Sequence, residues 1–91
     1  RMSFRSLVKE LGESVRRIHK MALESLSNGM SMVQIRAICE YNTQETVRVI
    51  RGMILTIKSA QFHPHKDLIP DLEDTISVGE RTLELVRPRG A

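Results

Sequence analysis

One long, periodic stretch, residues 31–62, limits what this 91-residue chain can fold into. The stretch reads SMVQIRAICEYNTQETVRVIRGMILTIKSAQF and contains no proline. Ser31 is followed three residues later by Gln34, which is the capping-box pattern found at helix N-termini. Apolar residues then recur mostly at steps of three and four, the spacing of one face of a helix. We therefore expect a helical bundle organised around residues 31–62.

The row of apolar residues predicted to be buried along this central helix, which we call its seam, is interrupted once. Its members are Met32, Ile35, Cys39, Thr46, Ile50, Met53, Ile57 and Ala60. Residues 42–45 are polar, and Asn42 with Glu45 would form a second capping box. Either the helix breaks near Tyr41 and Asn42, or it continues with residues 42–45 near solvent. Continuity is favoured because neither glycine nor proline marks a break and the seam resumes close to phase.

A first amphipathic helix is predicted over residues 3–27. Its apolar side chains step by four and three from Phe4 to Ala22, which indicates one buried face. Gly29 follows the helix, as expected for a C-terminus that needs a left-handed residue.

A third helix is predicted over residues 67–87. Asp67 is the expected N-cap, Pro70 is tolerated in the first turn, and Pro88 stops the helix. Gly79 lies in its apolar seam, where a missing side chain lets a neighbouring element come close. The predicted fold is therefore all-α, an antiparallel bundle of three helices that forms one domain over residues 1–91.

Composition excludes several other classes of protein. Hydrophobic residues make up 41% and charged residues 27% of the chain, which is too apolar for a disordered segment. The single cysteine, Cys39, cannot form an internal disulfide, and nothing at the N-terminus resembles a signal peptide. No apolar run approaches the roughly 18 residues of a membrane span. We expect a cytoplasmic domain, and the terminal residues Arg1 and 88–91 read as linker from a larger protein.

No catalytic or metal-binding constellation stands out. His63 and His65 flank Pro64 and are expected to be exposed loop residues, while Cys39 lies about two dozen residues upstream in a buried seam. His19 falls at the edge of the first helix's seam without a nucleophile to activate. We expect no enzymatic activity, no metal and no cofactor.

A second stripe lies on the side of the central helix opposite its seam. At 100° per residue it contains Ala37, Tyr41, Arg48, Leu55 and Phe62. Either the flanking helices bury this stripe, or it forms an exposed apolar strip edged by Arg48, Arg51 and Lys58. The exposed alternative resembles a groove for an amphipathic helix with acidic flanks. The candidate partner-binding residues are Tyr41, Arg48, Arg51, Leu55, Lys58 and Phe62.

Charge is compatible with an acidic partner. Residues 1–62 contain ten Lys and Arg against five Asp and Glu, while residues 63–91 contain four against six, within a net charge of +3. Nucleic-acid binding is a less favoured alternative. Residues 32–53 can be arranged as helix, turn, helix, but the turn has no glycine, and no aromatic residues interleave with the basic ones. Self-association as a plain oligomerisation bundle is a further alternative.

Over residues 39–86 the chain resembles the focal-adhesion-targeting type of helical bundle found in Cas-family and GIT-type adhesion scaffolds and in focal adhesion kinase. The shared features are Ile-Arg-Gly-Met at 50–53, Lys-Ser at 58–59, the Phe-His-Pro turn at 62–64 and a following amphipathic helix. The resemblance implies a non-enzymatic interaction module of a scaffold or signalling protein, which docks leucine- and aspartate-rich helices. Family bundles have four helices, so a partner or a second copy would supply the fourth.

Overall fold

A computed structural model describes residues 2–88 of the chain. It contains three α-helices, α1 (Phe4–Ser27), α2 (Met32–Ser59) and α3 (Ile69–Leu85), and a short 3-10 turn, η1 (Lys66–Leu68), precedes α3. None of the described residues forms a strand. The predicted all-α bundle of three helices is therefore confirmed. Arg1 and residues 89–91, which the sequence assigned to linker, lie outside the described residues.

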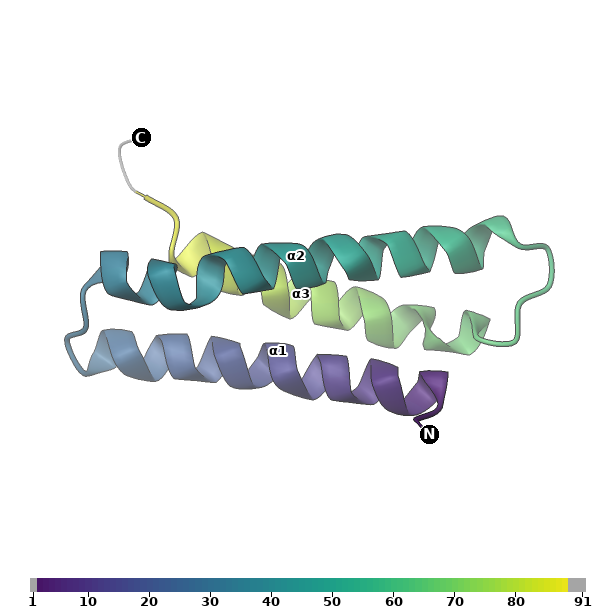
Figure 1. Ribbon diagram of the computed structural model, residues 1–91, viewed down its shortest axis with the longest axis horizontal. Helices are drawn as coiled ribbons and strands as arrows, with labels where there is room; N and C mark the ends of the chain where they lie inside the picture. Colours follow the sequence, from purple (N-terminus) through teal and green to yellow (C-terminus); the bar gives the residue numbers. More distant parts are fainter. Residues whose placement is uncertain (1, 89–91) are drawn as a thin grey trace.

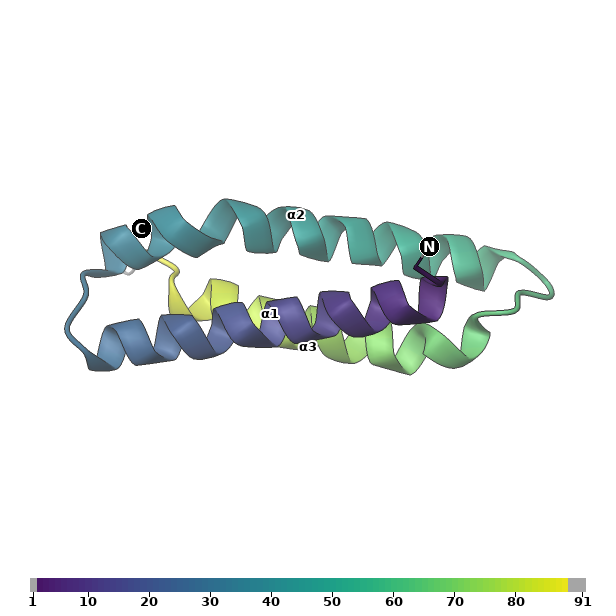
Figure 2. The ribbon, with the colours of Figure 1, turned by 60° about the horizontal axis from the view of Figure 1, so that its bottom comes forward.

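The helices form an elongated bundle with extents of 48 × 29 × 18 Å (Figures 1 and 2). Consecutive helices run antiparallel, so that α1 and α3 point the same way. Figure 1 shows α1 and α2 in front, with α3 behind and between them. α3 packs along both of the other helices, whereas α1 and α2 touch each other over fewer residues. This unequal packing leaves one side of the α1–α2 pair without a covering helix.

α2 is continuous past Tyr41 and Asn42, as the sequence favoured. Its start is the predicted capping box, in which the Ser31 hydroxyl accepts from the Gln34 backbone N–H at 3.2 Å and the Gln34 side chain accepts from the Ser31 N–H at 3.3 Å. Because no turn divides residues 32–53, the helix–turn–helix arrangement of that segment is wrong.

The end of α2 differs from the prediction. The helix stops at Ser59, and Ala60 is extended with φ −85° and ψ 133°, whereas the sequence predicted a helix to residue 62. The chain turns toward α3 here, and the residue before Pro64 is biased away from helical conformation. Phe62 therefore lies in the α2–α3 connection rather than on the helix.

The buried row of α2 also differs from the predicted seam. It contains Ile35, Cys39, Thr43, Val47, Ile50, Ile54 and Ile57. Thr43 is buried, so the prediction that residues 42–45 all lie near solvent is wrong. The steps of four at this point rotate the row toward α3, where Gly79 leaves space beside Thr43 and Val47. Thr46, predicted in the seam, is only half-buried.

The start of α3 is not capped by Asp67, contrary to the prediction. Leu68 is the N-cap and its position has no side-chain capping bond. The Asp67 carboxylate instead accepts a hydrogen bond from Arg5 Nη2 at 2.7 Å, and this bond lowers the pKa of the Asp67 carboxyl. The reason is geometric, because the 3-10 turn places Asp67 beside the first turn of α1.

The histidines of the α2–α3 connection are half-buried, so the prediction of exposed loop residues is wrong. The His65 ring packs against Phe4 with 4.6 Å between ring centroids, and His63 Nδ1 accepts from the His65 backbone N–H at 3.1 Å. The connection thus folds over the start of α1. His19 is half-buried at the edge of the buried face of α1, as predicted, with its Nδ1 2.8 Å from the Thr82 hydroxyl.

Cys39 is expected to react slowly with iodoacetamide in the folded protein. Its side chain is buried, and burial together with the Glu40 carboxylate raises the pKa of the Cys39 thiol. Since the thiolate is the nucleophile, both effects slow alkylation, by about tenfold or more relative to the unfolded chain. Mass spectrometry of quenched samples with and without denaturant measures the two rates. Equal rates would show that the core around Cys39 opens freely.

Candidate interaction surfaces

The six residues predicted to bind a partner lie on the outer side of α2 and in the turn that follows it. Tyr41, Leu55 and Phe62 are 76%, 71% and 88% exposed, so the flanking helices do not bury the second stripe. Leu55 shares a hollow of about 490 Å³ between α2 and α3 with Arg51 and Lys58. Tyr41, Arg48 and Phe62 lie outside this hollow. The structure thus brings three of the six residues together.

The cations of this set already have acidic neighbours within the chain. Arg48 Nη2 lies 2.8 Å from Glu45 Oε1, and their hydrogen bond lowers the pKa of the Glu45 carboxyl. Arg51 pairs with Glu80 of α3, and Lys58 Nζ lies 3.5 Å from Glu73 of α3. All of these pairs are exposed, so screening by solvent keeps the contribution of each to stability small. An acidic ligand at this surface would compete with the chain's own glutamates.

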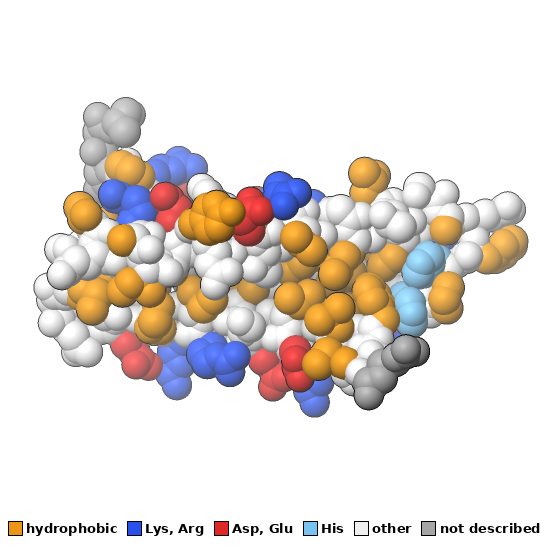
Figure 3. All heavy atoms as spheres, viewed as in Figure 1, with side chains coloured by type: hydrophobic (Ala, Val, Ile, Leu, Met, Phe, Trp, Pro, Cys, Tyr) orange, Lys and Arg blue, Asp and Glu red, His pale blue; other side chains and the backbone are white. Residues whose placement is uncertain are grey.

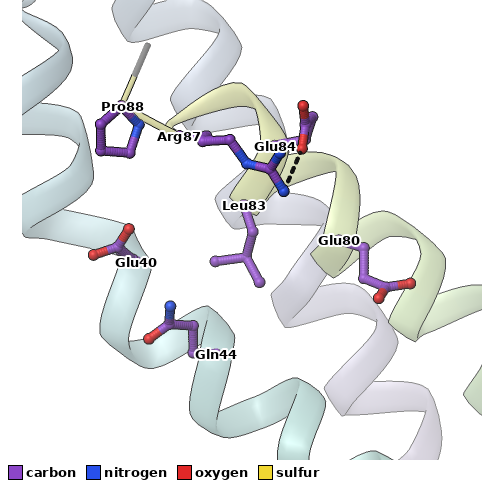
Figure 4. A pocket seen from close by; sticks show the side chains of 7 residues that line it. All are labelled: Glu40, Gln44, Glu80, Leu83, Glu84, Arg87 and Pro88. Atoms are coloured by element: carbon purple, nitrogen blue, oxygen red, sulfur yellow. Dashed lines mark ion pairs between the residues drawn. The ribbon is translucent and has the colours of Figure 1, made fainter. Parts of the chain in front are cut away.

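A second hollow, of about 390 Å³, lies between α2 and the end of α3 (Figure 4). Glu40 and Gln44 of α2 face Leu83 across it, while Glu80, Glu84 and Arg87 stand around its α3 side. Arg87 pairs with Glu84 at 3.1 Å. Among residues 2–88, no three His, Cys, Asp or Glu side chains gather as a metal site. The side chains around this hollow are mostly polar or charged.

An apolar surface lies between α1 and α2. Helical spacing places two rows of apolar residues on the side of these helices away from α3. We call this surface the open face, and its residues are Leu7, Leu11, Ile18 and Met21 of α1 and Ile38, Val49 and Met53 of α2. All seven are exposed or only half-buried. Figure 3 shows hydrophobic side chains gathered along this seam, with charged residues at its edges.

The side chains that α1 buries fully are small or medium-sized, whereas its larger apolar side chains are half-buried or exposed. Leu11 and Ile18 also pack against the core clusters. The residues of α1 that are fully buried are Val8, Gly12, Val15 and Ala22. Leu7 and Met21 are exposed, and Leu11 and Ile18 are half-buried. In a helix that packs on one side only, the large side chains usually fill the core, because they remove the most apolar area from water. The distribution in α1 is that of a helix packed on two sides with one side uncovered.

One end of the open face is hollowed. Phe4, Met53, Ile57, His63 and His65 line a mainly apolar hollow of about 360 Å³ at the junction of α1, α2 and the α2–α3 connection. Gly52 and Thr56 complete its wall. Figure 3 shows the two pale blue histidines next to the apolar seam. The hollow is large enough for one apolar side chain of a bound helix.

The open face is not among the surfaces predicted from the sequence, where the apolar residues of α1 are assigned to one buried face. Leu7, Leu11, Ile18 and Met21 nevertheless form a row of their own at steps of four, seven and three. Two adjacent rows on one helix indicate two packing partners. That signal was present, but only the position of α3 shows which row stays uncovered.

The fold and these surfaces define an all-α bundle of three helices with an unfilled apolar face. No family model, curated protein or solved structure matches this chain. The likeness to focal-adhesion-targeting bundles therefore stays a prediction. Within residues 2–88, no helix has both the length and the apolarity needed to cross a membrane.

Proposed function

We propose that this domain is a non-enzymatic protein-interaction module whose open face receives one amphipathic helix of a partner protein. The observation that carries the proposal is the row of Leu7, Leu11, Ile18 and Met21 on α1, which is exposed or half-buried on a side that no helix within residues 2–88 covers. A helix bound between α1 and α2 would stand opposite α3 and complete a four-helix bundle. The predicted resemblance to four-helix targeting domains supports the same conclusion.

The open face fits a helix better than an extended peptide. An extended peptide gains affinity by adding a strand to a sheet edge, and residues 2–88 contain no sheet. The row on α1 steps by four, seven and three residues and the row on α2 by eleven and four, which are multiples of about one helical turn, and the two helices run antiparallel. Such rows suit the side chains of a third helix. The hollow beside Phe4 and Met53 would take an anchoring leucine or aromatic residue.

We propose that this module serves as an adaptor segment of a cytoplasmic scaffold or signalling protein, since its one cysteine is a free thiol. Tyr41, 76% exposed on the outer side of α2, would remain accessible to phosphorylation while a helix occupies the open face.

A titration with a designed peptide tests this function. The probe is a 24-residue helix, the length of α1, with leucines at alternating steps of three and four on one side and glutamines elsewhere. Amide shifts of the labelled domain should move at Leu7, Leu11, Val49 and Met53. Shifts confined to Leu55 and Phe62 would place docking at the surface predicted from the sequence. If no amide shift changes as peptide is added, the proposed function is wrong.

Val49→Glu is expected to weaken the binding of this peptide to the domain by about tenfold or more. Val49 is 45% exposed, so the substitution leaves the fold intact, but a bound helix would bury the new carboxylate without a partner. Leu55→Glu is the matched control, because it changes an exposed aliphatic residue on the outer side of the same helix. Isothermal titration measures both affinities. An equal loss in both variants would show that the open face is not the binding site.

A further inference from the structure

The outer edge of α1 carries charges at the spacing of the apolar row beside it. Glu10, Arg17 and Glu24 follow one another at seven-residue intervals, and all three are exposed. Glu10 and Glu24 lie three residues after Leu7 and Met21 of the open face, and Arg17 lies three residues after the polar Ser14 midway between them. In helix pairs this position flanks the apolar seam and faces the edge of the neighbouring helix.

Two of these charges are uncompensated within residues 2–88. Neither Glu10 nor Arg17 forms an ion pair there, and Glu24 makes only a long contact of 4.0 Å with Lys20. The α2 edge is different. Glu45 is held by Arg48 at 2.8 Å, and the positions seven and fourteen residues further, Gly52 and Ser59, carry no charge. The electrostatic pattern of the open face therefore comes from α1.

We infer that the partner helix carries basic, acidic and basic residues at seven-residue spacing beside its apolar row. This inference rests on the proposed function. It differs from the sequence-based expectation of an acidic partner helix, because the partner's charges alternate in sign. Opposite charges beside a seam favour the correct partner and register, while like charges disfavour others. The alternating pattern reads the same in both chain directions, so it holds whether the helix binds parallel or antiparallel to α1.

The same pattern disfavours a second copy of this chain that binds antiparallel through the same face. If two α1 helices paired antiparallel about Arg17, the two arginines would meet and Glu10 would face Glu24 of the other copy. Like charges at flanking positions destabilise helix pairs. A partner with the opposite signs removes this conflict.

Two peptides that differ only in sign test the inference. Both share the leucine pattern of the probe above, and three flanking positions at seven-residue spacing read Lys, Glu, Lys in one and Glu, Lys, Glu in the other. At about 0.05 M salt, where screening is weak, the Lys-Glu-Lys peptide should bind about tenfold more tightly. The preference should fade toward about 1 M salt.

Exchanging the charges on the domain completes the test. Glu10→Lys with Arg17→Glu should reverse the preference between the two peptides. Asp74→Lys with Arg81→Glu is the matched control, since these residues are also seven apart, oppositely charged and exposed, but lie on α3. The control should keep the original preference. Equal binding of both peptides to the unmodified domain would overturn the charge inference alone, whereas no binding of either would overturn the proposed function as well.

Discussion

Replacing Ile50 with alanine is expected to lower the free energy of unfolding by about 2–5 kcal/mol, the range for large-to-small changes in a core. Ile50 has no exposed surface and packs in the cluster that joins α2 to α1 and α3 through Val8, Leu72 and Ile76. The loss combines the apolar area returned to water with a cavity that the neighbours fill only in part. For a domain of this size, the loss is a large fraction of a total stability of about 5–15 kcal/mol.

Urea unfolding followed by circular dichroism measures this change. Leu55→Ala is the matched control, because Leu55 lies on the same helix and is 71% exposed. The control should change the free energy of unfolding by no more than about 0.5 kcal/mol. If the two variants lose the same stability, α2 is rotated relative to its position in the structure and its buried row is misassigned.

Replacing Gly79 with alanine is expected to destabilise the fold, with overpacking costing about 1–3 kcal/mol. A Cβ atom at Gly79 would lie 2.6 Å from Val47 Cγ2, with Thr43 and Val15 methyl groups at 3.7 and 3.8 Å. The side chain of Val47 is branched at Cβ and has few other rotamers. Alanine would gain about 1 kcal/mol of helix propensity, which the clash exceeds.

Gly52→Ala is the control with the opposite expected sign. Gly52 lies within α2, and nothing stands within 4 Å of a Cβ added there. This variant should be more stable than the parent by about 0.5–1 kcal/mol, because it gains helix propensity without a clash. A double-mutant cycle with Val47→Ala isolates the contact, since Gly79→Ala should cost less when that methyl group is absent. Additive changes would show that Val47 is not the residue that excludes the side chain.

Much of the fold followed from local patterns. The capping box at Ser31 and Gln34 and the continuity of α2 were both predicted, because each depends on residues near one another in the chain. The errors lie where another element intervenes. Asp67 was predicted to cap α3, but the nearby guanidinium of Arg5, 62 positions away in the chain, binds its carboxylate.

The predicted binding site also differs from the structure where residues of another helix intervene. Helical spacing placed Tyr41 and Leu55 on the outer side of α2, and both are exposed. The sequence did not predict that Arg51 and Lys58 would pair with Glu80 and Glu73 of α3. Their availability to a ligand depends on which charges face them across the bundle, and a pattern within one helix contains no such information.

The sequence by itself determined that the chain forms three amphipathic helices, because the period of its apolar residues and its helix-terminal residues are local properties. Only the tertiary structure decided which apolar row stays uncovered. α3 packs against the face of α1 that contains Gly12, where an added Cβ would lie 3.2 Å from the Thr75 hydroxyl of α3, and Leu7 and Met21 of α1 stay exposed on the open face. This arrangement depends on the mutual fit of three helices, which no single helix encodes.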